Sequence, residues 1–468
     1  MSLGILERVH DADSLANLLK AGLITSSTPL KVVFRDKVDD GKIQLIKRLN
    51  VTHITCESGG DVDEEISFFE SEEYANFKEI SSLRVLTLRN GTYVLSLPLG
   101  LKELRADSAP ISILNTDMRK MKELEVMEIN FADDYPIPPN LTRLCIKWPF
   151  FASPESQIPS TVTDLTFDRD PLYKDIYSLP SSLTKFHITN PDFDMPDSFS
   201  ISQFPLLTDL EIPFIPSKDW PYLKTLPLTN LVMDVDENVE QLLPFLPESL
   251  TSVGLYIWPG TIDFRSINLP HLSTLHVMCE VLILPSTVTD LGLQSPPGPG
   301  TSIISPAKLR LESLRLFNDD NDNHIATFRF EGLTLANIEN LKLLDLGRFS
   351  IWGLERLQKL TSLKLREIDG DLNARYPSVT SLVTKKVISP VVFPQKLSHL
   401  DVEKISAADV PLGLSSLEVI EIEVPIDYVF TAERWRNIVA DKSTFNKLLK
   451  VSTPKQRRQL EKLVQEAW

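Results

Sequence analysis

The chain has 468 residues, of which 42% are hydrophobic, and its formal net charge is −16 at pH 7. This hydrophobic content is sufficient for a packed core and excludes wholesale disorder. The negative charge argues against a nucleic-acid-binding protein, which needs a broad basic surface, and against docking on anionic lipid.

The first residues and the cysteine content favour an intracellular, cytoplasmic setting. The N-terminal stretch lacks an uninterrupted apolar core and carries Glu7, Asp11 and Asp13, so it does not resemble a signal peptide. No run approaches the ~18 apolar residues of a membrane span. The chain has 3 cysteines, an odd number that excludes a complete disulfide framework.

The first predicted element is a short N-terminal helix. Leu15, Leu18 and Leu19 share one of its faces and could cover the open end of a repeat array. We therefore predict a helical cap over residues 1–28.

The main part of the chain repeats one short pattern. In "LPSSLTKFHI" the apolar Leu183, Phe186 and Ile188 alternate with Lys185 and His187, as a half-buried strand requires. The second apolar position of this L-x-x-L-x-L pattern recurs roughly every 22 residues, which is within the range of leucine-rich repeats. It falls at Val32, Ile54, Leu86, Leu104, Met127, Leu144, Leu165, Phe186, Leu210, Leu231, Val253, Leu275, Leu291, Leu314, Leu344, Leu363, Leu382, Leu400 and Ile420.

Such units cannot bury their apolar faces alone, and stacking them pairs each short strand with the next in parallel. We predict an α/β solenoid over residues 29–425, an irregular horseshoe with a parallel β-sheet on its concave side and a mostly extended convex side. The step from Leu275 to Leu291 is too short for a helix, so this connection should be extended.

The units resemble leucine-rich repeats. "LPSSLTKFHI", "LPESLTSVGL" and "IPPNLTRLCI" are similar to the opening of the bacterial LPX-type repeats, and they also resemble the divergent repeats of eukaryotic F-box/leucine-rich-repeat proteins. The asparagine of regular repeats is mostly missing, and Gly91, Pro149 and Asp170 stand at its position. Without an asparagine ladder, the inner turns must satisfy their backbone groups in another way.

Two acidic runs lie in the longest steps of the repeat. "GGDVDEEISFFESEEY" follows Ile54, and "NDDNDN" follows Leu314. We interpret the first as a solvated surface segment. Calcium is an alternative for the second, but it lacks the glycine and the terminal glutamate of an EF-hand loop.

The C-terminal part departs from the repeat and predicts a helical cap over residues 426–468. "TPKQRRQLEKLVQEAW" begins with a capping box and has proline at the first helical position. Its basic side chains could instead dock an acidic partner or an adaptor, and they are Lys455, Arg457, Arg458 and Lys462.

The sequence carries none of the common motifs of catalysis or ligand binding. The chain has no P-loop, no GxGxxG fingerprint, no Gly-x-Ser-x-Gly elbow and no HExxH motif, and His271 and His276, five residues apart across a turn and a strand, are interpreted as surface residues and not as a metal site. The LPX-type effectors carry a cysteine-dependent ubiquitin-ligase domain, but Cys56, Cys145 and Cys279 all lie within the repeats. The stretch "MSLGILERVHDADSLANLL" is too short for an F-box and does not match one. We predict a protein that is not an enzyme and that uses no cofactor, metal or small-molecule substrate.

The residues that flank the second apolar position would form the exposed columns of the sheet. They begin with an acidic sector, Asp164, Asp168, Asp209, Glu211 and Asp234. A small, partly aromatic middle follows, with Ser252, Gly254, Tyr256, Thr274, His276, Met278 and Gly292. A basic sector then holds Arg315, Phe317, Lys364, Arg366 and Lys385, and acid returns at Asp401, Glu403, Glu421 and Glu423.

Two interpretations of these columns remain open. Alternating strand positions are polar in any case, and their signs could drift by chance. Alternatively, aromatic anchors between opposite charges form a protein-binding groove. The predicted function is a non-catalytic protein-interaction module, and the alternative is a substrate receptor of a ubiquitin ligase or similar adaptor complex that docks through the C-terminal helices. The predicted contact residues are Asp209, Glu211, Asp234, Tyr256, His276, Met278, Arg315, Phe317, Lys364 and Arg366.

Overall fold

The computed structural model describes residues 15, 17, 20–21, 29–34, 40–57, 75–89, 94–106, 116–129, 136–147, 157–168, 171, 176, 178–235, 239–257, 260–294, 301–304, 311–317, 328–331, 343–345, 360–406, 410–411, 414–423, 446 and 458. The chain divides into two compact units, unit 1 from Met1 to Asp234 and unit 2 from Val235 to Trp468.

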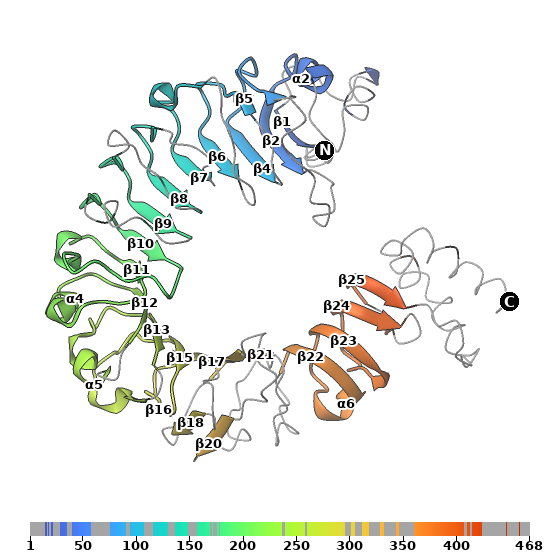
Figure 1. The fold of residues 1–468 in the computed structure, drawn as a ribbon. Helices are drawn as coiled ribbons and strands as arrows, with labels where there is room; N and C mark the ends of the chain where they lie inside the picture. Colours follow the sequence, from blue (N-terminus) through green and yellow to red (C-terminus); the bar gives the residue numbers. More distant parts are fainter. Residues whose placement is uncertain are drawn as a thin grey trace. The chain divides into compact units, whose positions relative to one another are not determined.

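Unit 1 contains a row of short strands that lie side by side in chain order (Figure 1). Each strand pairs in parallel with the next one along this row. The strands are β1 (Leu30–Phe34), β2 (Val51–Glu57), β4 (Val85–Arg89), β6 (Glu103–Ala106), β7 (Val126–Ile129), β8 (Arg143–Ile146), β9 (Asp164–Phe167), β10 (Lys185–Ile188), β11 (Asp209–Glu211) and β12 (Asn230–Asp234).

The connections of unit 1 hold a second, two-stranded parallel pair and a few helical turns. The pair is β3 (Ala75–Asn76) with β5 (Val94–Ser96). The helical segments are α2 (Asp40–Ile46), η1 (Met118–Lys120), η2 (Ile201–Gln203), η3 (Ser217–Asp219) and α4 (Trp220–Leu223).

Unit 2 repeats this plan with two rows of parallel strands. The first row is β13 (Ser252–Tyr256), β15 (Thr274–Met278), β17 (Asp290–Gln294), β19 (Ser313–Phe317), β21 (Leu343–Asp345), β22 (Ser362–Asp371), β23 (Ser381–Val392), β24 (His399–Ser406) and β25 (Ser416–Glu423). The second row is β14 (Thr261–Asp263), β16 (Val281–Ile283), β18 (Thr301–Ile304) and β20 (Phe328–Glu331). The helical segments are α5 (Val239–Leu242), η4 (Leu243–Phe245), η5 (Phe264–Ser266) and α6 (Leu372–Arg375).

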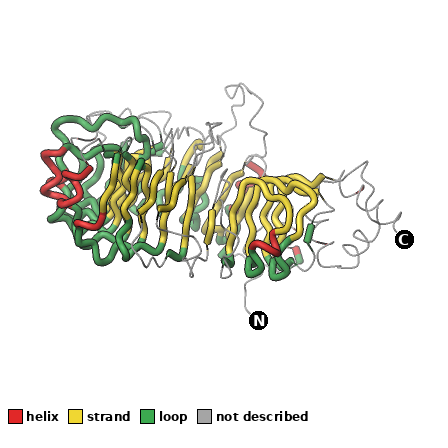
Figure 2. Tube along the Cα trace, turned by 90° about the horizontal axis from the view of Figure 1, so that it is seen from below, coloured by secondary structure: helices red, strands yellow, loops and turns green. Residues whose placement is uncertain are grey.

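Each unit is therefore a parallel β-solenoid of stacked coils with few helices, as expected for leucine-rich-repeat-like units. Figure 2 shows the short helical segments (red) beside the rows of strands (yellow). The connection between Leu275 and Leu291 is extended, as predicted, because it contains β16. The horseshoe curvature stays a prediction.

Helical turns begin where a short polar side chain can accept a hydrogen bond from a backbone amide. Asp117 accepts from Arg119 N at η1, Ser200 from Ser202 N at η2, and Asp371 from Ala374 N at α6. Such caps satisfy amides that the first helical turn leaves without a partner. The turns are too short to be stable alone, so packing against the sheet must maintain them.

The repeat register is confirmed along the main row of strands of each unit, with one correction. Wherever its side chain is described, the second apolar position from Val32 to Leu400 is at most 1% exposed. The last position was wrong, because Leu400 pairs with Leu417 and not with Ile420. The segment "LSSLEVIEIEV" contains two overlapping apolar alternations, and the sequence pattern alone did not separate them.

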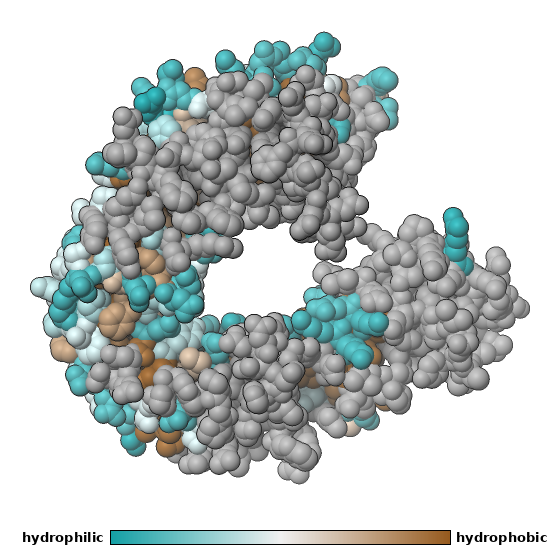
Figure 3. All heavy atoms as spheres, viewed as in Figure 1, coloured by the Kyte–Doolittle hydropathy of each residue, from teal (hydrophilic) through white to brown (hydrophobic). Residues whose placement is uncertain are grey.

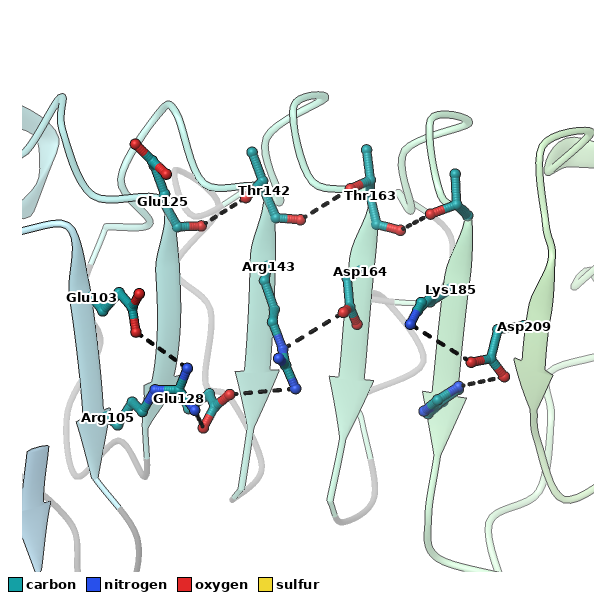
Figure 4. Close-up of polar contacts among 12 residues, drawn as sticks. Glu103, Arg105, Glu125, Glu128, Thr142, Arg143, Thr163, Asp164, Lys185 and Asp209 are labelled. Carbon is teal, nitrogen blue, oxygen red and sulfur yellow. Dashed lines mark hydrogen bonds and ion pairs between the residues drawn. The ribbon is translucent and has the colours of Figure 1, made fainter. Parts of the chain in front are cut away.

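A ladder of hydroxyl groups connects successive coils at the start of the strands. Thr184 Oγ1 donates to the Thr163 carbonyl at 3.0 Å, and Thr208 Oγ1 donates to the Thr184 carbonyl at 3.1 Å. The same carbonyls also accept two backbone amides from the next coil. Further donors of this ladder are Thr142, Thr163 and Thr229 in unit 1 and Ser273, Thr289, Thr380 and Ser398 in unit 2 (Figure 4 shows part of it).

We expect the Thr184→Val substitution to lower the free energy of unfolding by about 0.5–1.5 kcal/mol, the net value of one hydrogen bond. Valine keeps the β-branched shape and removes only the donor. The matched control is Thr166→Val on β9, whose hydroxyl has no hydrogen bond to another described residue. Chemical denaturation of both variants measures the difference, and equal midpoints would contradict a stabilising ladder.

Several predicted elements lie outside the described residues. They include both acidic runs and nearly all of the two predicted caps at 1–28 and 426–468. Leu15 is helical and buried, and Asn446 and Arg458 are helical and exposed. Within the described part of the chain, no helix combines the length and the apolar character needed to cross a membrane.

Candidate protein-binding face

The alternation of the strands places a second set of side chains on the face opposite the core. We call this face of the main row of each unit the strand face. It is lined by the residues that alternate along each strand with the buried positions, on both sides of the second apolar position and two residues farther along. The burial pattern of β10 shows this: Phe186 is fully buried, Lys185 is exposed and His187 is half-buried, as the alternation predicted.

Ion pairs connect neighbouring strands across the strand face of unit 1 (Figure 4). Arg105 lies 3.2 Å from Glu103 and 3.3 Å from Glu128, and Arg143 lies 3.5 Å from Glu128 and 3.6 Å from Asp164. Over β6 to β9 the charges thus alternate in sign and satisfy one another. Half-exposed pairs of this kind stabilise the fold only weakly, but they give each of these three carboxylates a guanidinium partner.

Acidic side chains are in excess farther along, on β10 to β12. His187 Nε2 lies 3.0 Å from Asp209 Oδ1, which also accepts a hydrogen bond from Asn230 Nδ2 at 2.6 Å. Glu211 Oε2 is 4.0 Å from His187 Nδ1, and its side chain is 39% exposed. The predicted residues Asp209 and Glu211 therefore lie in one polar group that spans three strands.

The pKa values of this group follow from its contacts. Burial lowers the pKa of His187, but the Asp209 carboxylate, followed by Glu211 and Asp164, outweighs burial and holds that pKa above its ordinary value. The contact with His187 holds the pKa of Asp209 below its ordinary value, although burial opposes this shift. The pair is thus best satisfied when His187 is protonated.

Asp234 is the last residue of β12, two residues beyond Val232, which pairs with Glu211. Burial, and then the negative charge of Asp192, raise the pKa of this carboxyl to about 6. No ion pair joins Asp234 to another described residue. An incoming cation would relieve the repulsion between these two carboxylates.

We expect the free energy of unfolding to fall as the pH rises above 6.5. His187 binds its proton more tightly in the folded chain, so its contribution is fully present below its ordinary pKa of 6.5 and is lost as the pH passes the folded value. Asp234 adds a further fall in the free energy of unfolding as the pH rises from the ordinary pKa of this carboxyl, 3.8, to its folded value of about 6.

The His187→Gln variant should lose the fall in the free energy of unfolding above pH 6.5, whereas His271→Gln, at an exposed site, should keep it. Denaturation midpoints between pH 6 and 8, below the pH at which the three thiols titrate in the unfolded chain, test this, and identical slopes for both variants would contradict it.

Unit 2 places the predicted apolar and aromatic residues on adjacent strands. Tyr256 on β13 is directly opposite Met278 on β15, and both are half-buried. His276 lies between Gly254 and Gly292 in the same register row. Its ring covers Gly292 so closely that a Cβ atom there would be 2.7 Å from His276 Cδ2. The two neighbours of His276 in this row therefore have no side chain, and at Gly292 the imidazole occupies the space that a side chain would need.

The basic sector of unit 2 is partly paired. Arg315 lies 3.6 Å from Asp290, a residue that the sequence analysis did not single out, and Lys385 lies 3.8 Å from Glu403. Lys364 is exposed on β22. The side chains of Phe317 and Arg366 lie outside the described residues, so their predicted contacts stay predictions.

The three cysteines of the chain have little nucleophilic character. Burial raises the pKa of Cys56 and of Cys279 to about 12, and that of Cys145 to about 11. A thiol reacts as its thiolate, so these side chains are unreactive at neutral pH.

A cavity of about 650 Å³ opens at the edge where β10 and β11 end. It is lined by the segment 193–198, which follows β10, and by Phe214, which follows β11. The sequence analysis missed it because both segments are irregular loops. The available signal was the alternation of acidic and large apolar residues in "PDFDMPD".

Comparisons with known proteins do not assign the chain to a family. No family model matches it, and no curated protein sequence does. Among solved structures, it is similar to CroV588, described as a novel circular LRR protein, at 17% sequence identity and a TM-score of 0.34. The match covers 86% of this chain and 68% of that one.

Proposed function

We propose that the chain is a non-catalytic protein-interaction module that binds a protein partner on its strand face. The observation that carries this proposal is a change in how the carboxylates of unit 1 are paired. From β6 to β9 each of the three carboxylates lies within 3.6 Å of a guanidinium, whereas Glu211 on β11 is 4.0 Å from an imidazole and Asp234 on β12 forms no ion pair with another described residue. Carboxylates with so few basic neighbours favour a partner of the opposite charge.

The half-buried pair Tyr256 and Met278 supports the same function in unit 2. Aromatic and methionine side chains supply much of the energy of protein interfaces. If Tyr256 is an anchor, truncating it to alanine should cost more than about 1 kcal/mol of binding free energy. The unreactive cysteines and the solenoid architecture support a role that is not catalytic.

The experiment begins with capture of binding proteins on the immobilised full chain, followed by purification of the captured protein and titration at two salt concentrations. We expect the double variant Glu211→Gln/Asp234→Asn to bind more slowly, about tenfold more weakly, and with a smaller salt dependence. The matched control Glu123→Gln removes an exposed carboxylate elsewhere in unit 1 and should bind like the unmodified protein.

The adaptor alternative predicts a different result. Arg458 is helical and exposed, and it belongs to the basic C-terminal segment. If Arg458→Glu abolishes binding while the double variant and Tyr256→Ala bind normally, the strand face is not the binding surface and the adaptor alternative replaces this proposal.

A further inference from the structure

The cavity at the ends of β10 and β11 combines apolar walls with an acidic rim. Phe193, Met195 and Phe214 contribute two aromatic rings and a thioether to its lining. Asp194 and Asp197 line the same cavity, and both are exposed. Two aromatic side chains and two carboxylates in one cavity are complementary to a cation with an apolar stem.

The charge around the cavity is negative even after its cations are counted. Lys218 donates a hydrogen bond to the backbone carbonyl of Asp197, which places one ammonium at this edge. The negative charges are those of the two lining carboxylates, Asp194 and Asp197, and of Asp192 and Asp234 nearby. No described residue forms an ion pair with the carboxylate of Asp194 or of Asp197. A positively charged group entering the cavity would therefore gain favourable electrostatic energy.

The size of the cavity limits the choice of occupant. About 650 Å³ is more than one side chain fills, so there is room for a long side chain together with the backbone that carries it. Arginine fits better than lysine, because its planar guanidinium can stack on an aromatic ring and bind a carboxylate through two parallel hydrogen bonds. Methionine adds an adaptable wall that can close on the aliphatic stem.

We propose that this cavity is the anchor pocket of the interaction module and binds an arginine side chain of the protein partner. This inference rests on the proposed function, since Phe214 follows Glu211 by three residues and Asp192, which precedes Phe193, is close enough to Asp234 for their charges to repel. The partner segment crosses the acidic excess of β11 and β12 with basic residues, and its arginine enters between Phe193 and Phe214. The carboxylates of Asp194 and Asp197 neutralise the guanidinium.

The test uses the full chain and a defined probe at pH 7.5. The probe is a fluorescein-labelled glycine–serine nonapeptide with lysine at its second and eighth positions and arginine at its centre. Two further peptides replace the arginine with citrulline, which has nearly the same shape without the charge, or with lysine. We expect the citrulline peptide to bind about tenfold more weakly than the arginine peptide, and the lysine peptide to lie between them.

Protein variants locate the binding. Asp194→Asn and Asp197→Asn keep the size of exposed side chains and should each weaken the arginine peptide severalfold, while Glu123→Gln should leave it unchanged. Phe214→Leu keeps an apolar wall without the ring and should reduce the preference for arginine over lysine. Melting curves of the variants confirm that each remains folded.

The outcomes separate this inference from the proposed function. Equal binding of the arginine and citrulline peptides, or unchanged binding by both aspartate variants, overturns the pocket. If Glu211→Gln/Asp234→Asn still weakens binding in that case, the strand face remains the binding surface and only the anchor is wrong. If the aspartate variants weaken binding and the strand-face variant does not, the pocket stands and the proposed binding surface fails.

Discussion

We expect Phe186→Ala to be among the most destabilising single substitutions in unit 1, with a loss of about 3–5 kcal/mol in the free energy of unfolding. Phe186 is fully buried on β10. Its ring lies 6.2 Å from those of Phe199 and Phe204 and 6.4 Å from that of Phe167. Truncation would open a cavity between Phe167, which ends β9, and Phe199 and Phe204, which lie in the connection between β10 and β11, so neither segment can close it alone.

The matched control for this prediction is Lys185→Ala, the adjacent residue on the same strand. Its side chain is exposed on the strand face, and its loss should change the free energy of unfolding by no more than about 0.5 kcal/mol. Chemical denaturation, followed by the circular dichroism of the strands, compares the two variants. A similar small effect for both would mean that the alternation of β10 is assigned to the wrong face.

The second large effect should come from Gly292→Ala. The new methyl group would be 2.7 Å from Cδ2 and 3.1 Å from Cγ of His276, inside the normal contact distance. His276 is held in its row by the neighbouring strands, so the ring must rotate or the strands must separate, at a cost of about 1–3 kcal/mol. Gly100→Ala serves as a control because its nearest neighbour, at 3.1 Å, is the flexible end of Arg84.

A second substitution distinguishes this clash from a general effect of losing glycine. In the background of His276→Ala the ring is gone, and Gly292→Ala should then cost little. The double-mutant cycle should show a coupling of more than about 1 kcal/mol in the favourable direction. Additive effects in the cycle would show that the imidazole does not fill the space above Gly292.

The sequence predicted the core of the fold because the repeat pattern is itself the cause of burial. The L-x-x-L-x-L alternation placed the buried residues and the parallel order of the strands from Val32 to Leu400. It failed at the last strand, where "LEVIEIEV" offers two alternations and the pairing with β24 selects the one that begins at Leu417. Register there depends on a neighbouring strand, which no local pattern encodes.

The hydroxyl ladder could also have been found in the sequence. A threonine or serine recurs two residues before the second apolar position, as at Thr163, Thr184 and Thr208. Threonine is common in strands in any case, so its recurrence at this position does not by itself indicate a hydrogen-bonded ladder. The ion pairs around Arg105 and Arg143 were less accessible, since they depend on which rotamers meet across a parallel pair.

The candidate site was only partly predictable, because alternation within one strand does not determine the contacts between strands and loops. Alternation correctly placed Asp209, Glu211, Tyr256 and Met278 on the strand face. It could not show that Asp209 is held by His187 and Asn230, or that loops after β10 and β11 enclose a cavity. Figure 3 shows hydrophilic (teal) and apolar (brown) residues adjoining on the face seen near β11 and β12, a mixture that irregular loops produce and a strand pattern does not.

Carboxyl footprinting of the purified complex tests the central claim most directly. Exposed carboxylates are labelled with an amine in the free chain and in the complex, and the extent of labelling at each residue is measured by mass spectrometry. If a partner covers the strand face of unit 1, Glu211 should lose most of its labelling in the complex, while Glu123 and Glu248 keep theirs. Unchanged labelling at Glu211, with protection confined to carboxylates elsewhere, would contradict binding on the strand face.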